Sequence, residues 1–440
     1  MKAREANKVG LLSIGLPYFN IQCAAKYLQV TRKFLGKNWL VSGPEIVITN
    51  REMLDNAIRE FFPAKNVDVL VLQIGTFPDG EFPLVLAEEL NIPIILHSLP
   101  EPDLEHNIDL NSLCGVNLST YSLSATGHSH SFVHGDPGDK KVQAELTAHV
   151  RAGLALASLH GLHIGLLGFH APGFYSCVFD ELMLRRILGV SLDYIDLGEV
   201  KRAFNPGVRK QAPHKTFQTP EEDALPDTTI QWMEAHYAAL NGVFEASGKQ
   251  VFAVRDWPEL LDINAPGSIW PALGWLLDDG YLLAPEGDVN AAVTMYLAKL
   301  LGDGVPFFSD ISAWDDDLSA LLCWHYGGAP SLANDPGQIR FGRDGRQVEF
   351  TLKPGPATLL RLGMKDHQFR LLGVASRVLD KPVTIKRAGA WLQSLNMPAG
   401  DVVHQLLDQG WEHHYCLIYG DILTELRVFS KLSGISLEVL

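Results

Sequence analysis

Two acidic residues each follow an apolar run that is typical of a buried strand. Glu286 comes directly after YLLAP and Asp310 after VPFFS, and the residues between them are typical of one helix. In a parallel sheet, the carboxyl ends of neighbouring strands lie at one edge, where α/β proteins bind their ligands. We therefore expect neighbouring strands to bring Glu286 and Asp310 to one site.

Two carboxylates at one site repel each other, and a divalent cation relieves that repulsion. Oxygen ligands favour Mn²⁺ or Mg²⁺, and an added imidazole favours Mn²⁺, Co²⁺ or Fe²⁺. Imidazoles are available at His325, in LLCWHYGGAP, and at His413 and His414, in GWEHHYCLIYGD. Adjacent side chains of a strand point to opposite faces, so we expect only one of that pair to reach the site.

A simpler interpretation makes the two acids capping residues. Glu286 would cap a helix that begins near Asp288, and Asp310 would cap a turn before Trp314. A single histidine is also more often an ordinary half-buried residue than a metal ligand. The residue types alone leave both interpretations open.

Strands and helices alternate over the first two-thirds of the chain. Apolar runs such as VGLLSIGL, VDVLVLQIG and HIGLLGF are separated by amphipathic segments. Short apolar strands between helices indicate parallel sheets covered on both faces. We predict an α/β fold with two doubly wound, Rossmann-like parallel-sheet domains, at residues 1–159 and 160–302.

The pattern differs at two places. Residues 98–134 lose the periodicity and fill with Pro, Asn, Ser and His, so we expect a functional loop there. After about residue 335, polar and apolar residues alternate around an Asp-Gly turn, as in QIRFGRDGRQVEFTL, which indicates antiparallel strands. Residues 303–440 are therefore predicted to form a mostly β domain, closed by the helix ILTELRVFSKLSG.

Composition excludes several classes of partner. A net charge of −15 argues against nucleic acid and anionic membranes. No apolar run reaches the ~18–20 residues of a membrane helix. The five cysteines are scattered, which is typical of a reducing cytoplasm. We expect a cytoplasmic protein.

The segment APEGDVNAAVTMYLAKLLGDGVPFFSDI resembles the signature of the L-fucose isomerase / L-arabinose isomerase superfamily. Further segments are similar to that superfamily in the same order along most of the chain, and they are PEP…LNSLCGVN, HIGLLGFHAPGF, VRDWPEL, HYGGAP, LKPGPATLLRL and HHYCLIYGD. The shorter, fucose-isomerase-like branch is the most similar. Pro285 and Tyr326 stand where relatives often have Cys, which affects the pocket shape and the substrate.

The resemblance implies an enzyme, a metal-dependent aldose–ketose isomerase that acts on a fucose- or arabinose-like monosaccharide through an ene-diol. It implies that Glu286 and Asp310 bind Mn²⁺ and act as the acid/base pair. His414 or His413 would be the C-terminal metal ligand, and His325 would join the site. It also implies a homo-oligomer, a hexamer or a trimer unit, in which the 98–134 loop reaches a neighbouring active site.

Sugar contacts are expected from the loop and from two tryptophans. The candidates are Asn111, Ser112, Asn117, Trp257 and Trp324, with Glu101, His128 and His130 also in the loop. Two alternatives remain. The substrate could be a rarer or acid-bearing sugar, with Arg255 or His170 meeting its charge, or the chain could be a non-catalytic sugar-binding or regulatory protein on the same scaffold.

Overall fold

The computed structural model describes residues 8–63, 66–207, 225–262, 264–342 and 347–440. The chain divides into two compact units, Met1–His160 with Thr424–Gly434, and Gly161–Leu423 with Ile435–Leu440. The predicted Asp-Gly turn lies outside the described residues. In the part that is described, no helix is both long and apolar enough to cross a membrane.

Unit 1 is built on one parallel sheet with the strand order β2-β1-β4-β5-β6, and β3 also pairs with β1. Its strands are β1 (Lys8–Ile14), β2 (Leu40–Ser42), β3 (Val47–Ile48), β4 (Val69–Ile74), β5 (Ile94–Ser98) and β6 (His130–His134). Its helices are α1 (Ile21–Leu35), α2 (Arg51–Phe61), α3 (Glu81–Leu90), α4 (Ser112–Ala125), α5 (Lys140–Leu159) and α12 (Leu423–Ser433).

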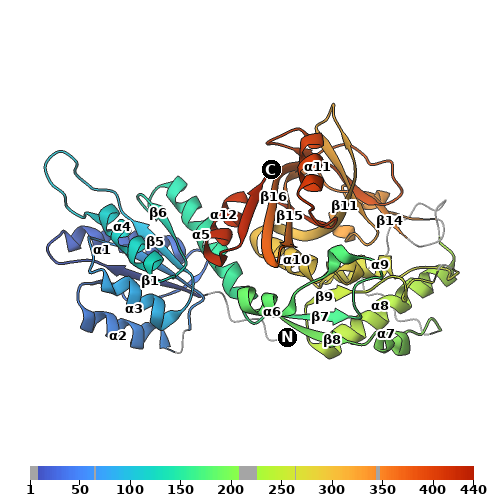
Figure 1. Ribbon diagram of the computed structural model, residues 1–440, viewed down its shortest axis with the longest axis horizontal. Coiled ribbons are helices and arrows are strands. Elements are labelled where there is room, and N and C mark those ends of the chain that lie inside the picture. The colour runs from blue at the N-terminus through green and yellow to red at the C-terminus, as the bar shows by residue number, and fades with distance from the viewer. Residues whose placement is uncertain (1–7, 64–65, 208–224, 263, 343–346) are drawn as a thin grey trace. The chain divides into compact units, whose positions relative to one another are not determined.

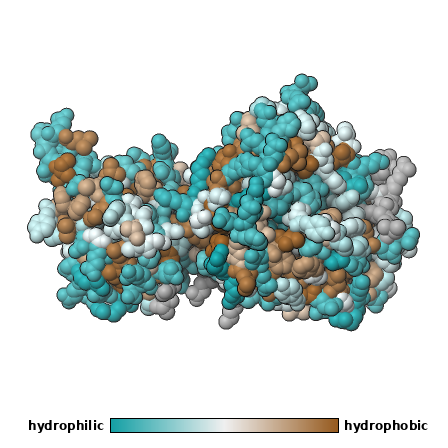
Figure 2. All heavy atoms as spheres, in the orientation of Figure 1, coloured by the Kyte–Doolittle hydropathy of each residue, from teal (hydrophilic) through white to brown (hydrophobic). Residues whose placement is uncertain are grey.

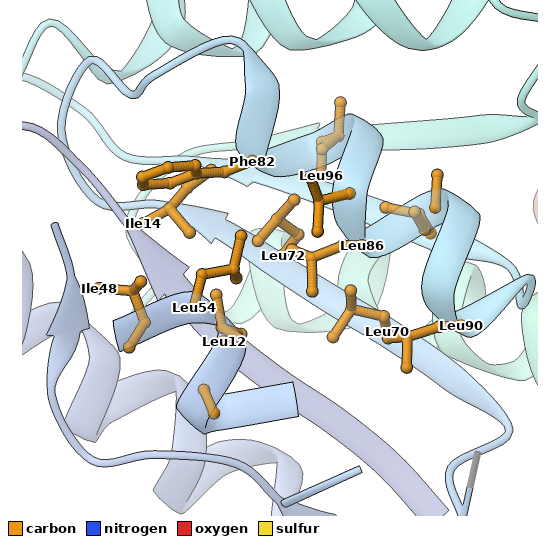
Figure 3. Close-up of a cluster of buried hydrophobic side chains, with 14 of the residues drawn as sticks. Leu12, Ile14, Ile48, Leu54, Leu70, Leu72, Phe82, Leu86, Leu90 and Leu96 are labelled. Atoms are coloured by element: carbon orange, nitrogen blue, oxygen red, sulfur yellow. The ribbon is translucent and has the colours of Figure 1, made fainter. Parts of the chain in front are cut away.

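Helices cover both faces of this sheet because successive strand residues point to opposite sides. On one face, Leu72 and Leu96 pack with Leu86 of α3, as Figure 3 shows. On the other face, the alternate strand residues, such as Val71, pack against α1 and α5. Each fully buried leucine contributes about 1.5–3 kcal/mol relative to leaving it exposed.

Residues 98–134 are not one long loop. The structure has helix α4 and strand β6 inside that range, so this prediction was wrong. Ser, Thr and Asn stand at many positions of α4, which leaves no apolar stripe for a periodicity argument to find. Exposed apolar side chains of this segment line one pocket, and they are Leu104, Ile108, Leu113 and Phe132. Figure 2 shows hydrophobic side chains, in brown, on the face of the molecule that it displays.

Unit 2 begins with a second parallel sheet, of order β10-β9-β7-β8. Its strands are β7 (His163–Leu167), β8 (Ser191–Ile195), β9 (Val251–Val254) and β10 (Leu282–Ala284). The helices of this part are α6 (Glu181–Met183), α7 (Leu197–Ala203), α8 (Asp227–Ser247), α9 (Trp270–Asp278) and α10 (Val289–Leu301).

The rest of unit 2 is a sheet of nine strands. They are β11 (Asp303–Asp315), β12 (Ala320–His325), β13 (Arg340–Phe341), β14 (Val348–Thr351), β15 (Gly355–Lys365), β16 (Gln368–Val378), β17 (Ala388–Ser394), β18 (Tyr415–Tyr419) and β19 (Ser436–Val439), with helix α11 (Ala399–Asp408) before β18. The antiparallel order β17-β12-β11-β18-β15-β16 returns to β17 and so closes a barrel.

The prediction of an α/β chain with two parallel sheets and a β-rich C-terminal part is confirmed. That these sheets are Rossmann-like stays a prediction, as do the domain boundaries at 159/160 and 302/303. Helix α10 connects the second parallel sheet to the barrel, since it packs against β9 and β10 on one side and β11, β15 and β18 on the other. That connection positions the site described next.

Candidate active site

Glu286 lies just beyond β10, in a backbone conformation that is unusual for a residue with a side chain. Its φ is 62° and its ψ is 13°, and Gly287 follows with a φ of 72°. A Cβ at Gly287 would lie 2.4 Å from the carbonyl oxygen of Phe169, so only glycine fits. The left-handed conformation at Glu286 costs about 1–3 kcal/mol and therefore needs support from its surroundings.

Asp256 supplies that support, and the sequence analysis missed it. Its Oδ1 accepts a hydrogen bond from the backbone N–H of Glu286 (2.7 Å), and its Oδ2 accepts one from the indole N–H of Trp270 (2.7 Å). Burial, together with repulsion from Glu286, raises the pKa of Asp256 to about 6. Asp256 follows β9 as Glu286 follows β10, so the strand-end argument used for Glu286 would have found it.

Asp310 reaches the same place from a different sheet. It lies within β11 of the barrel and pairs with Trp324 of β12, so it does not end a neighbouring parallel strand. The expectation that one parallel sheet would align both acids was therefore wrong. Burial raises the pKa of Asp310 to about 6; His414 lowers that pKa and Glu286 raises it.

The capping interpretation is contradicted as well. The N-cap of α10 is Asp288, whose carboxylate accepts a hydrogen bond from the Ala291 N–H at 2.8 Å, and Glu286 is not a cap. Asp310 lies inside β11, just before a bulge in its pairing with β12, rather than at a turn. Both carboxylates are therefore left for another role.

His414 lies between the two acids and is 1% exposed. Its Nε2 is 2.9 Å from Glu286 Oε2 and 3.9 Å from Asp310 Oδ1. The ligating atoms of Asp310, His325 and His414 lie within 4.8 Å of one another, as do those of Glu286, His413 and His414. The structure thus brings together the two acids and the three histidines that the sequence analysis selected.

A buried ion pair fixes the orientation of His414. Its Nδ1 is 3.0 Å from Asp288 Oδ2, and the same carboxylate binds the guanidinium of Arg361 at 2.8 Å. Burial raises the pKa of Asp288, but Arg361 and His414 outweigh burial and hold it below its ordinary value. Asp288 is therefore a carboxylate, and His414 directs its other nitrogen, Nε2, at Glu286 and Asp310.

This arrangement fits a divalent cation. Glu286 Oε2 and Asp310 Oδ1 are buried, and His414 Nε2 is the group that approaches both, at 2.9 Å and 3.9 Å. Burial lowers the pKa of His414, yet its hydrogen bonds to Asp288, Cys177 and Glu286 raise it well above the ordinary value. A proton on Nε2 and a metal cation are thus alternative ways to relieve the repulsion at this position. Two carboxylates and an imidazole suit Mn²⁺ or a similar ion.

His413 and His325 occupy different positions around this centre. His413 is exposed, and its Nδ1 lies 2.8 Å from the Ser176 hydroxyl. His325 is 3% exposed, and burial holds its pKa well below the ordinary value, so its ring is neutral and free to bind a metal. Of the adjacent pair, His414 is the residue whose Nε2 lies close to both acids, so its geometry suits a metal site shared with them.

The expected sugar-binding tryptophans both lie in unit 2. Trp257 packs against Phe174 at a centroid distance of 5.5 Å, and Phe174 in turn packs against His413 at 5.7 Å. Trp324 is the cross-strand partner of Asp310 and donates its indole N–H to Ser312. Both are partly buried, so each has a face left to contact a ligand.

The expected sugar-binding residues of the 98–134 segment lie in unit 1. Asn111 and Asn117 line a pocket of about 790 Å³ with mostly apolar neighbours, among them Leu104 and Ile108. Ser112 is buried, donates to the Ile74 carbonyl and accepts from the Leu99 N–H at 2.8 Å. The Ser112 hydroxyl is therefore used inside unit 1.

Arg255, suggested for an acid-bearing substrate, already has partners. Its guanidinium forms a two-point ion pair with Glu259 and donates to the His170 carbonyl oxygen at 3.2 Å. An incoming anion would have to displace these partners.

The geometry defines a class of site, in which two carboxylates and an imidazole from a parallel sheet and a β-barrel converge on one point. No family model matches the chain. Curated relatives align over nearly the whole length. The chain is 28% identical over 433 residues to the sulfoquinovose isomerase of Alkalicoccus urumqiensis, covering 96% of each chain. It is also 28% identical to the sulfoquinovose isomerases of Priestia megaterium (97% of each chain) and a Clostridium species (98% of this chain and 99% of the relative).

Proposed function

We propose that this chain is a divalent-metal-dependent aldose–ketose isomerase of a sulfonated hexose, with sulfoquinovose as the substrate to test first. The observation that carries the proposal is the convergence of Glu286 Oε2 and Asp310 Oδ1 on His414 Nε2. The relatives that match nearly the full length are named as isomerases of this sugar. These names support an isomerase; they do not name the fucose and arabinose isomerase superfamily, and the metal remains part of the proposal.

The metal would be held by Glu286, Asp310 and His414, with His325 beside them. Bound there, a divalent cation would polarise the sugar carbonyl and stabilise the negative charge of the ene-diol, a contribution of several kcal/mol. Mn²⁺ fits the donor set best, and Mg²⁺, Co²⁺ or Fe²⁺ would also fit.

The chain's own acids would move the protons. In an aldose–ketose conversion, one group removes a proton from carbon and another transfers a proton between the two oxygens. Glu286 and Asp310 lie on either side of His414 and can fill these two roles, each contributing about 10²–10⁴-fold. Asp256 and Asp288 would not touch the substrate; they hold Glu286 and His414 in place.

The test is isomerisation in heavy water. Protein stripped with a chelator and reloaded with Mn²⁺ is incubated with sulfoquinovose, L-fucose and L-arabinose. We expect the ketose of sulfoquinovose with deuterium at C1, because an abstracted proton exchanges with solvent. Turnover that persists in the stripped protein, or a ketose without deuterium, would contradict the metal or the proton-transfer part of the proposal.

Two amide variants test the acid/base assignment. Glu286→Gln and Asp310→Asn should each lower kcat by at least about 10²-fold while the circular dichroism spectrum stays native. Asp317→Asn, the same change at an exposed position between β11 and β12, is the matched control and should keep the wild-type rate. Near-normal turnover by Glu286→Gln would refute its role.

The same experiment separates an enzyme from a non-catalytic sugar-binding protein. The near full-length similarity to proteins named as isomerases supports the enzyme. A protein that binds sulfoquinovose with and without metal but never isomerises it would instead support the binding protein.

A further inference from the structure

Arg387 is a cation placed on aromatic rings near the candidate active site. It directly precedes β17, and its guanidinium carbon lies 4.8 Å from the centroid of the Tyr326 ring and 5.7 Å from that of Trp324. Its side chain is half-buried. Two aromatic faces thus hold the guanidinium in one position, which lowers the entropy that it would lose on binding a ligand.

The hydrogen-bonding groups of this guanidinium are largely unused. One amino group donates to the Lys386 carbonyl oxygen at 2.6 Å, and the buried Nε–H has no acceptor in the part of the chain that the structure describes. Within the described residues, no carboxylate lies within the 4.0 Å of an ion pair with Arg387. By contrast, Arg361 is paired with Asp288, and Arg255 is paired with Glu259.

Strand register links Arg387 to the metal-binding acids. Ala388, the next residue, pairs with His325, and Gly389 pairs with Trp324, which is also the partner of Asp310. Gly389 and Asp310 are therefore two strand spacings apart, about 10 Å, and Arg387 lies two residues, about 7 Å, further along the strand direction. The backbones of Arg387 and Asp310 are thus about 12 Å apart. The arginine side chain and the open chain of a six-carbon sugar can together span that distance.

The aromatic rings continue from Arg387 to Glu286. Tyr326 stacks on Trp270 at a centroid distance of 3.9 Å and an angle of 11°. Trp270 donates to Asp256, which holds the backbone of Glu286. A series of ring contacts and hydrogen bonds therefore links Arg387, which has no ion-pair partner among the described residues, to the backbone of Glu286.

We propose that Arg387 binds the sulfonate of the substrate and so determines the preference for a sulfonated sugar. This inference rests on the proposed isomerase function. A guanidinium offers two parallel N–H donors to an oxyanion, and it is weakly hydrated, as a sulfonate is. Tyr326 and Trp324 form the surface on which the guanidinium lies, which gives Tyr326 a role where similar enzymes often have Cys.

The test compares a sulfonated and a neutral sugar. Arg387→Met keeps the length of the side chain and removes the charge, so KM for sulfoquinovose should rise about 10- to 100-fold. KM for 6-deoxyglucose, which lacks the sulfonate, should be unchanged. Arg387→Lys keeps the charge without the two-point geometry and should give an intermediate KM.

Arg377→Met is the matched control, because Arg377 is an exposed arginine on β16 of the same unit. It should leave both KM values unchanged. An equal loss on both sugars, or an unchanged KM for sulfoquinovose in Arg387→Met, would overturn the assignment. If Arg387→Met fails to fold, the KM values of Arg387→Lys decide the test: a raised KM for sulfoquinovose alone supports the assignment, and an unchanged KM overturns it.

A separate measurement distinguishes this inference from the proposed function. Calorimetric titration of the metal-free protein with sulfoquinovose needs no turnover. If the wild type isomerises no sugar yet binds sulfoquinovose more tightly than Arg387→Met does, the proposed function fails and the sulfonate site stands. Equal binding by the two proteins would overturn the site whatever the enzyme does.

Discussion

His414 is the residue on which the candidate site depends. One ring nitrogen faces Asp288 at 3.0 Å, and the other faces Glu286 at 2.9 Å. The sequence left His413 and His414 equivalent, because adjacent residues differ only in the face to which they point. The buried pair of Asp288 and Arg361 decides between them, since only His414 can reach it.

Asp288→Asn tests this residue-scale account. Asparagine is as good an N-cap as aspartate, so α10 should keep its start. The neutral amide orients the His414 ring less strongly, so we expect Mn²⁺ affinity to fall about 10- to 100-fold. Titration calorimetry with Mn²⁺ measures this directly, and an unchanged affinity would show that the Asp288 carboxylate is not needed to orient His414.

Helix α10 is the element that joins the two parts of the site. It begins at Val289, its N-cap Asp288 lies two residues after Glu286, and it leads into β11, which carries Asp310. The Leu362 N–H of β15 donates to the Thr294 hydroxyl of α10 at 2.9 Å, which ties the helix to the barrel. The strand–helix–strand pattern was visible in the sequence. The sequence did not show that the second strand enters a barrel, because the strands with which β11 pairs include β18, a distant segment of the chain.

Strand β5 contains a buried histidine that makes the stability of unit 1 depend on pH. Nε2–H of His97 donates to the Gly135 carbonyl oxygen at 3.0 Å, and the ring is 0% exposed. Burial lowers the pKa of His97 to about 4. The unfolded chain therefore binds more protons than the folded chain between about pH 4 and 6.5, so stability falls as the pH falls through that window.

Because of His97, we expect the free energy of unfolding to fall by about 2 kcal/mol when the pH is lowered from 7.5 to 5. In His97→Gln, which cannot gain the charge, the loss over the same interval should be smaller by about that amount. Urea unfolding at the two pH values measures the difference. The same loss in both proteins would show that His97 can be protonated without unfolding.

At the scale of the whole molecule, a bound metal should stabilise unit 2. Its candidate ligands come from the end of a parallel strand, from β11 and from the residues before β18, so a cation would cross-link the two parts of that unit. Mn²⁺ at about 100 times its Kd adds about 2.7 kcal/mol. Calorimetric melting should show a transition that rises by several degrees with Mn²⁺ and falls with chelator.

His414→Asn is the comparison for that measurement, because it removes one of the converging ligand atoms. We expect its melting temperature to be independent of Mn²⁺. A variant that responds to Mn²⁺ as the wild type does would place the stabilising ion elsewhere. The homo-oligomer, the cytoplasmic location and the roles of Asn111, Ser112 and Asn117 stay predictions.

The sequence by itself determined the two parallel sheets, the β-rich C-terminal part and the choice of Glu286, Asp310 and the histidines. The sheets and the β-rich part follow from local periodicity. The site residues follow from residue types at strand ends together with the resemblance to the L-fucose isomerase / L-arabinose isomerase superfamily. Only the tertiary structure decided that Asp310 lies in a barrel, that His414 rather than His413 faces both acids, and that Asp256 holds the backbone of Glu286. Each of these depends on ion pairs, ring contacts and strand register between residues far apart in the chain, and no local pattern encodes them.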